Sequence, residues 1–239
     1  MQKSNKINLL VYLALWRRPE ITELCFMGLD RLKRHDSFNI SVFAVISEKE
    51  MIPLCDKYGV KWIMHDNQPL GKKKNYGLRQ LKNIDFDYMM EIGSDDLITN
   101  ELLDQYLDYF GKYECFGISD AAYINSETLE CRRLTSQKTN YGAGRCISKK
   151  VLEECNWVLW NDGLGRGLDN NSILKIETLG YKYQKVEPKD VPGVIDIKSN
   201  ENLWKFNYFL GEEYDVNLVL QKLSENEISK LNSLVNVSA

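Results

Sequence analysis

Two adjacent carboxylates, Asp95 and Asp96, follow an apolar run that ends at Ile92. An apolar run of this length, bounded by turn residues, is typical of a buried strand. In open α/β sheets, ligands bind just beyond the carboxyl ends of the strands. Paired carboxylates offer hard oxygen ligands that suit Mg²⁺ or Mn²⁺. The turn therefore predicts a metal site that bridges the protein and substrate phosphates. The alternative is that both residues only begin a helix at Leu97, because Asp favours helix starts.

A basic run, Lys72-Lys73-Lys74, begins a predicted helix upstream of this turn. Three cations at a helix start oppose the helix macrodipole, and such local conflicts often mark functional sites. A bound anion would resolve the conflict. The alternative is an exposed basic turn, because solvated charge runs are common.

A third polar stretch is the glycine-rich loop of residues 161–171, which contains Asp162 and Asp169 and follows Trp157 and Trp160. Tryptophans beside such a loop suit a sugar ring, whose CH face stacks on an aromatic ring. They are equally typical of a core, because tryptophan is mostly buried. Asp169 could also only cap the helix that follows.

Composition limits the classes of function. The 239 residues carry a net charge of −3, which demands no polyanionic partner and indicates one large domain, with or without an appendage. The six cysteines form no CxxC pair, so a zinc site is not expected and a reducing compartment is. The apolar start is too short to cross a bilayer and has no cleavage site. We therefore expect a cytoplasmic protein without a transmembrane segment.

The elements that must position these residues alternate between strand and helix, which predicts an α/β fold with a mostly parallel sheet flanked by helices. Strands are expected at residues 7–15, 40–46, 60–64, before Gly93, and at 115–118, 122–125, 131–134, 146–147 and 181–186. Residues 194–200 are either a further strand end or a loop. Helices are expected at 19–32, 47–58, 72–82, 100–112, 149–154 and 172–179. Amphipathic helices are expected from Glu212 onward.

Three motifs in this order resemble those of GT-A glycosyltransferases, in particular the inverting family-two type. Residues 16–20 (Trp-Arg-Arg-Pro-Glu) are similar to the Tyr-Asn-Arg-Pro-Glu-like turn of that family. Residues 71–78 are similar to its Gly…Ala-Arg-Asn-x-Gly-Leu helix start, with Lys in place of Arg. Residues 93–96 (Gly-Ser-Asp-Asp) are similar to its strand-ending Asp-x-Asp-Asp. The resemblance covers residues 7–97, is looser over 139–180 and is absent after 200.

The resemblance implies a GT-A domain over residues 1–205 and a helical tail over 206–239. A donor half (about 1–120) would bind a nucleotide-sugar, with a UDP-sugar the expected donor. The residues implied for donor binding are Leu13, Ala14, Trp16, Arg17, Ser47, Glu48, Lys74, Ser94 and Asp95. The implied ligands of Mn²⁺ or Mg²⁺ are Asp95, Asp96 and Asp196.

An acceptor half (about 121–205) would bind the sugar acceptor. Its implied residues are Gly144, Arg145, Trp160, Asp162 and Leu168. Asp169 would be the general base that takes a proton from the acceptor hydroxyl. Two positions depart from the family: Gly93 replaces the first Asp of the metal motif, and Leu168 replaces the Glu expected before the base. Asp162 is a competing base.

Other readings of the sequence remain open. The missing first Asp is compatible with a degenerate protein that binds a nucleotide-sugar or a partner without turnover. A nucleotidyltransferase would usually carry a glycine-rich loop after the first strand, and residues 16–19 contain no glycine. A nucleic-acid-binding module could use Lys72–Lys74 with stacking aromatics, although the acidic balance opposes it. A modified nucleic-acid base is also a conceivable acceptor of an active transferase. The C-terminal helices are a candidate surface for homo-oligomerisation.

Overall fold

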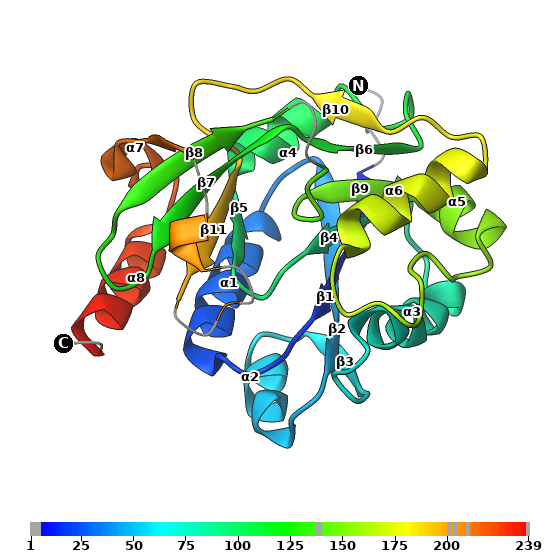
Figure 1. The fold of residues 1–239 in the computed structure, drawn as a ribbon, viewed down its shortest axis with the longest axis horizontal. Helices are drawn as coiled ribbons and strands as arrows, with labels where there is room; N and C mark the ends of the chain where they lie inside the picture. The colour runs from blue at the N-terminus through cyan, green and yellow to red at the C-terminus, as the bar shows by residue number, and fades with distance from the viewer. Residues whose placement is uncertain (1–5, 137–139, 200–201, 203–204, 209–210, 238–239) are drawn as a thin grey trace.

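The computed structural model describes residues 6–136, 140–199, 202, 205–208 and 211–237, whose strands form two sheets (Figure 1). The main sheet has seven strands in the order β10-β6-β9-β4-β1-β2-β3. Its strands are β1 (Ile7–Ala14), β2 (Phe38–Ile46), β3 (Lys61–Met64), β4 (Tyr88–Ile92), β6 (Cys115–Ile118), β9 (Arg145–Ser148) and β10 (Gln184–Val186).

The second sheet has five strands in the order β12-β8-β7-β11-β5. Its strands are β5 (Asp96–Ile98), β7 (Asp120–Asn125), β8 (Cys131–Thr135), β11 (Val194–Lys198) and β12 (Glu212–Glu213). The helices are α1 (Pro19–Leu32), α2 (Ile52–Lys57), α3 (Leu70–Gln80), α4 (Asn100–Tyr106), α5 (Lys149–Glu154), α6 (Leu168–Thr178), α7 (Val216–Leu220) and α8 (Glu225–Val237). Three short 3₁₀ helices are η1 (Lys49–Met51), η2 (Leu81–Asn83) and η3 (Phe206–Tyr208).

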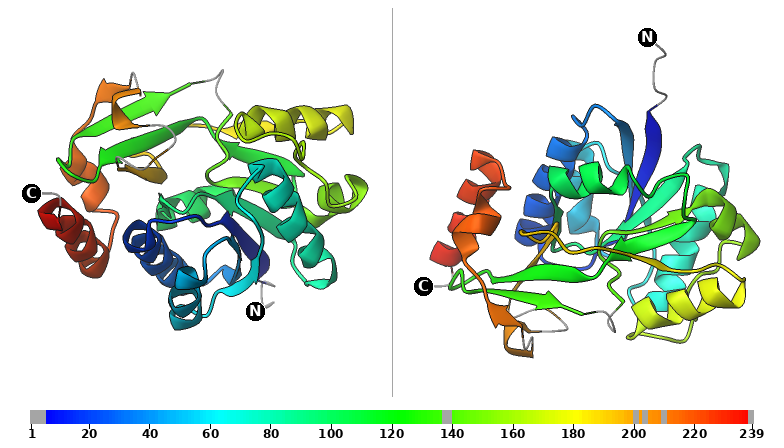
Figure 2. Two further views of the ribbon diagram at one scale, coloured as in Figure 1. Left: turned by 60° about the horizontal axis from the view of Figure 1, so that its bottom comes forward. Right: turned by 90° about the horizontal axis from the view of Figure 1, so that it is seen from above.

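The main sheet is mostly parallel, as the alternation of strands and helices predicts. β1 pairs in parallel with both β2 and β4, and only β9 runs antiparallel to its neighbours β4 and β6. Residues 9–13 of β1 are at most 1% exposed, because helices cover both faces of a parallel sheet. Figure 2 shows α1 and α2 on one face of this sheet and α3, α5 and α6 on the other.

The second sheet was not predicted as a separate unit, and it changes the interpretation of two segments. Residues 194–198 form β11 in its interior, paired with β7 and β5. Residues 96–98 are strand β5, and α4 begins only at Asn100, where Thr99 Oγ1 accepts a hydrogen bond from the backbone N–H of Leu102 at 3.2 Å. The interpretation of Asp95 and Asp96 as helix caps is therefore wrong.

Local sequence signals located several element ends well and others poorly. The expected bounds of α1 and α5 match the structure, and the expected antiparallel pair of residues 122–125 and 131–134 is β7 and β8. Helix α4 ends at Tyr106 instead of residue 112, and α6 begins at Leu168 instead of residue 172. The expected α/β class, with helices on both faces of a mostly parallel sheet, is confirmed.

The C-terminal segment packs on the domain through α8. Leu231 of α8 is fully buried in a third apolar cluster with residues of α1 and the second sheet. Ser224 and Glu227 form a reciprocal capping box, in which each side chain accepts a hydrogen bond from the other's backbone N–H. Glu227 is fully buried and also pairs with Arg31 Nε of α1 at 2.9 Å. No helix in the described ranges is long and apolar enough to cross a membrane.

We expect Glu227→Ala to lower the free energy of unfolding by about 3 kcal/mol, because removing one member of a buried ion pair leaves the other charge uncompensated. The matched control is Glu225→Ala, which removes a carboxylate from the exposed side of the same helix turn. Urea unfolding followed by circular dichroism measures both variants. An equal loss in both would mean that the pair with Arg31 does not hold the tail.

Candidate active site

Three carboxylates meet where the two sheets join. Asp95 and Asp96 lie between the end of β4 in the main sheet and the start of β5 in the second. Asp196 of β11 pairs directly with Asp96 in the antiparallel register of β11 and β5. One oxygen from each of the three carboxylates lies within 4.8 Å of the others. The register of the second sheet therefore assembles the predicted acidic triad.

The pKa values of the three carboxylates show how burial and neighbouring charges act on the triad. Burial and the neighbouring carboxylates raise the pKa of Asp96 well above its ordinary value. Burial also raises the pKa of Asp196 to about 6, although Lys198 Nζ lies 2.6 Å from its carboxylate. Burial acts in the same direction on Asp95, but Arg18 at 3.0 Å, with Lys198, outweighs it and the pKa of Asp95 is lowered.

The donor set of the triad fits a divalent cation. Its ligand atoms are carboxylate oxygens, which suit Mg²⁺ and Mn²⁺. The Oδ1 atom of Asp196 is buried and has no hydrogen-bond partner among the residues that the structure describes. A buried acceptor without a partner is costly, and a bound cation would satisfy it.

Gly93 occupies the position where the family that the sequence resembles has its first Asp. A Cβ atom there would lie 2.8 Å from Asp95 Oδ1 and 2.9 Å from Asp96 Oδ2. The backbone N–H of Gly93 also donates to Asp96 Oδ2 at 2.5 Å. Asp95 and Asp96 lie against this glycine, so the departure from the family motif has a physical reason.

We expect Gly93→Ala to weaken Mn²⁺ binding by about tenfold, the lower end of the loss seen when the support of a metal ligand is disturbed. The added methyl group would push two ligand oxygens apart. Isothermal titration with Mn²⁺ measures the effect. Gly163→Ala is the control, because an added Cβ there meets only the side chain of Asn161, at 3.3 Å. Unchanged affinity in Gly93→Ala would show that the close approach is not needed.

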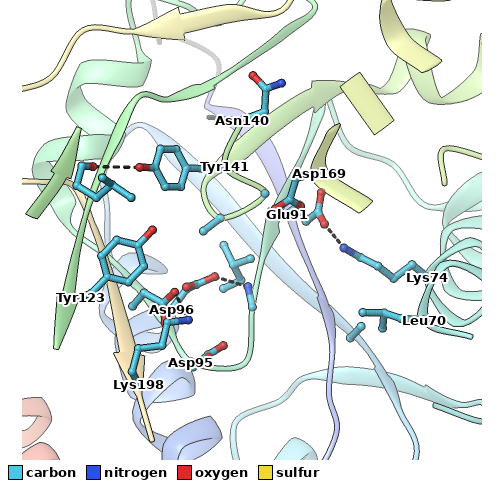
Figure 3. Close-up of a pocket in the computed structure, with 17 residues that line it drawn as sticks. Leu70, Lys74, Glu91, Asp95, Asp96, Tyr123, Asn140, Tyr141, Asp169 and Lys198 are labelled. Atoms are coloured by element: carbon cyan, nitrogen blue, oxygen red, sulfur yellow. Dashed lines mark hydrogen bonds and ion pairs between the residues drawn. The ribbon is translucent and has the colours of Figure 1, made fainter. Parts of the chain in front are cut away.

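A pocket of about 410 Å³ extends from the triad to Asp169. Figure 3 shows Asp95 and Asp96 on one side of this pocket and Asp169 on the other. The pocket is lined by Ala14, Leu70, Lys74, Glu91, Ile92, Gly93, Asp95, Asp96, Tyr123, Leu134, Asn140, Tyr141, Gly142, Ala143, Asp169, Asp196 and Lys198. Two separated carboxylate sites thus share one cavity.

Asp169 lies in the first turn of α6, with its side chain about half exposed. The N-cap position belongs to Gly167, which has a φ of 69°, so the interpretation of Asp169 as the cap is wrong. A Cβ atom at Gly142 would lie 2.4 Å from Asp169 Oδ1. The glycine therefore leaves room for this carboxylate at the pocket wall.

The pKa of Asp169 is raised, which suits a group that accepts a proton. Desolvation by the protein atoms around the carboxylate is the largest cause, although about half of the side chain remains exposed, and the neighbouring carboxylate of Glu91 adds to it. The cations Arg145 and Lys74 act in the opposite direction. Because burial dominates, the carboxylate is a stronger base than a solvated Asp.

The basic helix start separates into three environments. Lys72 is exposed, as an ordinary basic turn would be. Lys73 is fully buried and donates to the backbone carbonyl of Leu15 at 2.5 Å, and burial lowers its pKa to about 8. Lys74 lines the pocket and pairs with Glu91. The exposed-turn interpretation holds only for Lys72.

The turn after β1 connects to the acidic turn through a residue that the sequence analysis did not select. Arg17 and Arg18 both have φ near +55°, in the left-handed region. Arg18 donates to Asp95 Oδ2 at 3.0 Å and to Ser94 Oγ at 2.9 Å. The guanidinium of Arg17 instead lies 4.5 Å from the ring centroid of Trp16.

The predicted site residues divide into two groups. Those that line the pocket are Ala14, Lys74, Asp95, Asp96, Asp169 and Asp196. Those outside its lining are Leu13, Trp16, Arg17, Ser47, Glu48, Ser94, Gly144, Arg145, Trp160, Asp162 and Leu168. Arg145, Trp160 and Leu168 are buried, and Asp162 accepts a hydrogen bond from Asn75 Nδ2 at 2.7 Å.

Several pocket residues escaped the sequence analysis: Glu91, Tyr123, Asn140, Tyr141 and Lys198. Of these residues, Glu91 could have been selected from the sequence. It is a charged residue inside the apolar run of β4, and a buried charge needs a partner. Lys198 lies two residues after Asp196 on β11, so both side chains lie on the same face of the strand. Only the pairing of β11 within the second sheet places this face at the triad.

Comparison with solved structures shows the fold. The catalytic domain of Drosophila β1,4-galactosyltransferase 7, solved with xylobiose, matches with a TM-score of 0.53 and 10% identity over 92% of this chain and 81% of that one. The mannosyltransferase PcManGT from Pyrobaculum calidifontis, solved with GDP-mannose and Mn²⁺, matches with a TM-score of 0.54 and 12% identity over 84% of this chain. This chain spans 59% of the length of that protein.

A cytidylyltransferase from Leptospira borgpetersenii also matches, with a TM-score of 0.49 and 17% identity over 96% of both chains. No protein-family model matches this chain, and no curated protein matches it by sequence. The chain therefore has a GT-A-like fold, shared with glycosyltransferases at low sequence identity.

Proposed function

We propose that the protein is a metal-assisted glycosyltransferase of the inverting family-two type. It moves a sugar from a nucleotide-sugar donor, with a UDP-sugar the expected one, to an acceptor hydroxyl. The observation that carries the proposal is the presence, in one pocket, of a carboxylate triad that fits a divalent cation and of a separate carboxylate with a raised pKa. The GT-A-like fold supports it.

Asp95, Asp96 and Asp196 would hold Mn²⁺ or Mg²⁺. When bound, the cation supplies positive charge that stabilises the leaving nucleoside diphosphate. The chain's own cations support the same end of the pocket, because Lys198 lies in its lining and Arg18 contacts Asp95. Without a metal ion, the five lining carboxylates are matched at most by Lys74 and Lys198 in the lining and by the contacts of Arg18 and Arg145, so the pocket offers no excess of positive charge to an anionic diphosphate.

Asp169 is the general base of the proposed reaction. Its carboxylate takes the proton of the acceptor hydroxyl as that oxygen bonds to the anomeric carbon of the donor. The bond between this carbon and the diphosphate oxygen breaks, and the nucleoside diphosphate leaves with the electron pair. Attack from the side opposite the leaving group inverts the anomeric centre. The placement of Asp169 on one side of the pocket and of Asp95 and Asp96 on the other supports this geometry (Figure 3).

A second candidate is a protein of the same fold that binds a nucleotide-sugar without turnover. The observation that favours it is that two members of the triad already have cationic partners, Arg18 for Asp95 and Lys198 for Asp196. In this case the two side chains would neutralise the carboxylates and no metal would be needed. The two candidates differ in whether EDTA abolishes nucleotide binding.

The test is a thermal-shift panel of UDP, GDP, CDP and dTDP with their sugars, each with Mn²⁺, Mg²⁺ or EDTA. A ligand that binds only the folded state raises its stability by mass action. Metal-dependent stabilisation by one nucleotide supports the transferase and identifies the nucleobase of the sugar donor. Stabilisation that survives EDTA supports the metal-free binding protein. No stabilisation under any condition contradicts both candidates.

A further inference from the structure

A chain of four alternating charges links the donor side of the pocket to Asp169. Lys74 of α3 pairs with one carboxylate oxygen of Glu91 on β4. The other oxygen of Glu91 accepts from Arg145 Nη2 of β9 at 2.5 Å. The same Arg145 Nη2 lies 3.9 Å from Asp169 Oδ1, and Arg145 Nη1 donates to the backbone carbonyl of Asp169 at 3.1 Å. Two cations and two anions therefore alternate along one path.

The sheet register builds the centre of this chain. Glu91 and Arg145 lie directly opposite each other in the antiparallel pair of β4 and β9. Both are buried, Glu91 at 3% and Arg145 at 0% exposure. Burial disfavours the Glu91 carboxylate, but Arg145 and Lys74 outweigh it and its pKa is lowered. Glu91 therefore stays charged and holds Arg145 in place.

Stability alone does not account for this arrangement. Replacing a buried ion pair with apolar residues of similar volume is often neutral or stabilising. The Nε atom of Arg145 is buried without a hydrogen-bond partner among the described residues, which adds a further cost. The guanidinium uses its two terminal nitrogens to contact Glu91 and Asp169 instead. Departures from local optimisation of this kind are expected at functional sites.

We propose that Arg145 and Glu91 are positioning residues for Asp169: Arg145 fixes the base, Glu91 fixes Arg145, and Lys74 completes the charge balance. This proposal rests on the proposed function, in which Asp169 is the base. It gives Arg145 a role different from the acceptor contact that the family resemblance implies, because its side chain is fully buried. Arg145 contacts Asp169 through Oδ1 and the backbone carbonyl, so Oδ2 takes no part in these two contacts.

The charged and titratable groups that face Asp169 fix the sign of each effect. They are Lys74 from α3, Glu91 from β4, Arg145 from β9 and the buried Tyr183 next to β10. Glu91 raises the pKa of Asp169, and Arg145 lowers it. Removing the charge of Glu91 should therefore lower the titration midpoint of Asp169, and removing the charge of Arg145 should raise it. Misfolding or a loss of packing alone predicts no such opposite pair of shifts.

The experiment follows the Asp169 carboxyl carbon by ¹³C NMR during a pH titration of the full chain. The resonance is assigned by its loss in Asp169→Asn. We expect Glu91→Gln to move the midpoint down and Arg145→Met to move it up, each by about one unit, the usual effect of one nearby charge. Arg145→Lys, which keeps the charge, should restore most of the wild-type midpoint. Midpoints unchanged in both folded variants would overturn the proposal.

Two further variants keep the test decisive if the single variants do not fold. Glu91→Met with Arg145→Met replaces the pair by apolar residues of similar length, so it should fold even if the single variants do not. We expect it to lower kcat by about 10²-fold, as a misplaced catalytic group does, without weakening nucleotide binding, because the change removes an anion, Glu91, from the pocket lining. Full kcat in this folded double variant would overturn the proposal. Arg133→Lys, in the Asp120–Arg133 pair of the second sheet, is the matched control and should change neither readout.

Failure of this proposal is distinguishable from failure of the proposed function. The NMR titration does not require turnover, so it reports the charge chain even if no acceptor is known. If Asp169→Asn retains transfer, the proposed base is wrong while the titration shifts still stand. If Asp169→Asn abolishes transfer and the titration midpoints stay unchanged, only the positioning role is wrong.

Discussion

Asp169→Asn lowers the transfer rate by at least about 10²-fold, the usual contribution of a general base, and does not weaken nucleotide binding. Asparagine has the same shape, so it fits beside Gly142 as the carboxylate does. It cannot accept the proton of the acceptor hydroxyl. Asp95 and Asp96 lie on the opposite side of the pocket from Asp169 (Figure 3), so the substitution removes none of the proposed metal ligands. Initial rates with a saturating donor, together with nucleotide titration of the same preparation, measure both quantities.

The matched control for this prediction is Asp162→Asn. Asp162 belongs to the same glycine-rich loop and was the competing candidate for the general base. However, its side chain accepts a hydrogen bond from Asn75 and lies outside the pocket lining. We expect it to keep a rate within threefold of the wild-type rate. A large loss in Asp162→Asn with a normal rate in Asp169→Asn would exchange the two assignments. Equal losses in both would point to the loop's structure as the cause.

The sequence predicted those parts of the fold whose signals are local. Pro19 at the first helical turn fixes the start of α1, and the apolar run of β1 predicts a strand covered on both faces. The pairing of distant segments has no local signal. Residues 96–98 look like a helix start because Asp favours such positions, and only their pairing with β11 makes them a strand. The second sheet was therefore missed.

The same distinction applies to the site. Asp95 stands in a turn, Asp96 directly after it at the start of β5, and Asp169 at a helix start, positions where acidic residues attract notice, and all three line the pocket. Glu91 and Arg145 stand within strands, where a pattern-based analysis expects apolar residues and treats a charge as an exception. Their partnership depends on the register of β4 and β9, which a single sequence does not encode in any short motif.

Asp96→Asn reduces Mn²⁺ affinity by about tenfold or more, because losing a ligand should cost at least as much as losing its support. The amide keeps the shape of the side chain, and its oxygen can still accept the hydrogen bond from Gly93 N–H. The lost charge is therefore the main change. We expect nucleotide binding to fall with metal affinity, since the pocket without the metal offers no excess of positive charge to a diphosphate. Titration with Mn²⁺ alone, then with nucleotide at fixed Mn²⁺, separates the two effects.

Asp85→Asn controls for net charge, because Asp85 is exposed and outside the pocket lining. The informative result is the nucleotide affinity of Asp96→Asn in EDTA. If it equals that of the wild type in Mn²⁺, the cations Arg18 and Lys198 hold the diphosphate and the triad only orients them. If neither protein binds nucleotide in EDTA, nucleotide binding requires a divalent ion. Nucleotide affinity with and without the metal, measured in the wild type and in Asp96→Asn, thus decides between the metal-assisted transferase and the metal-free binding protein.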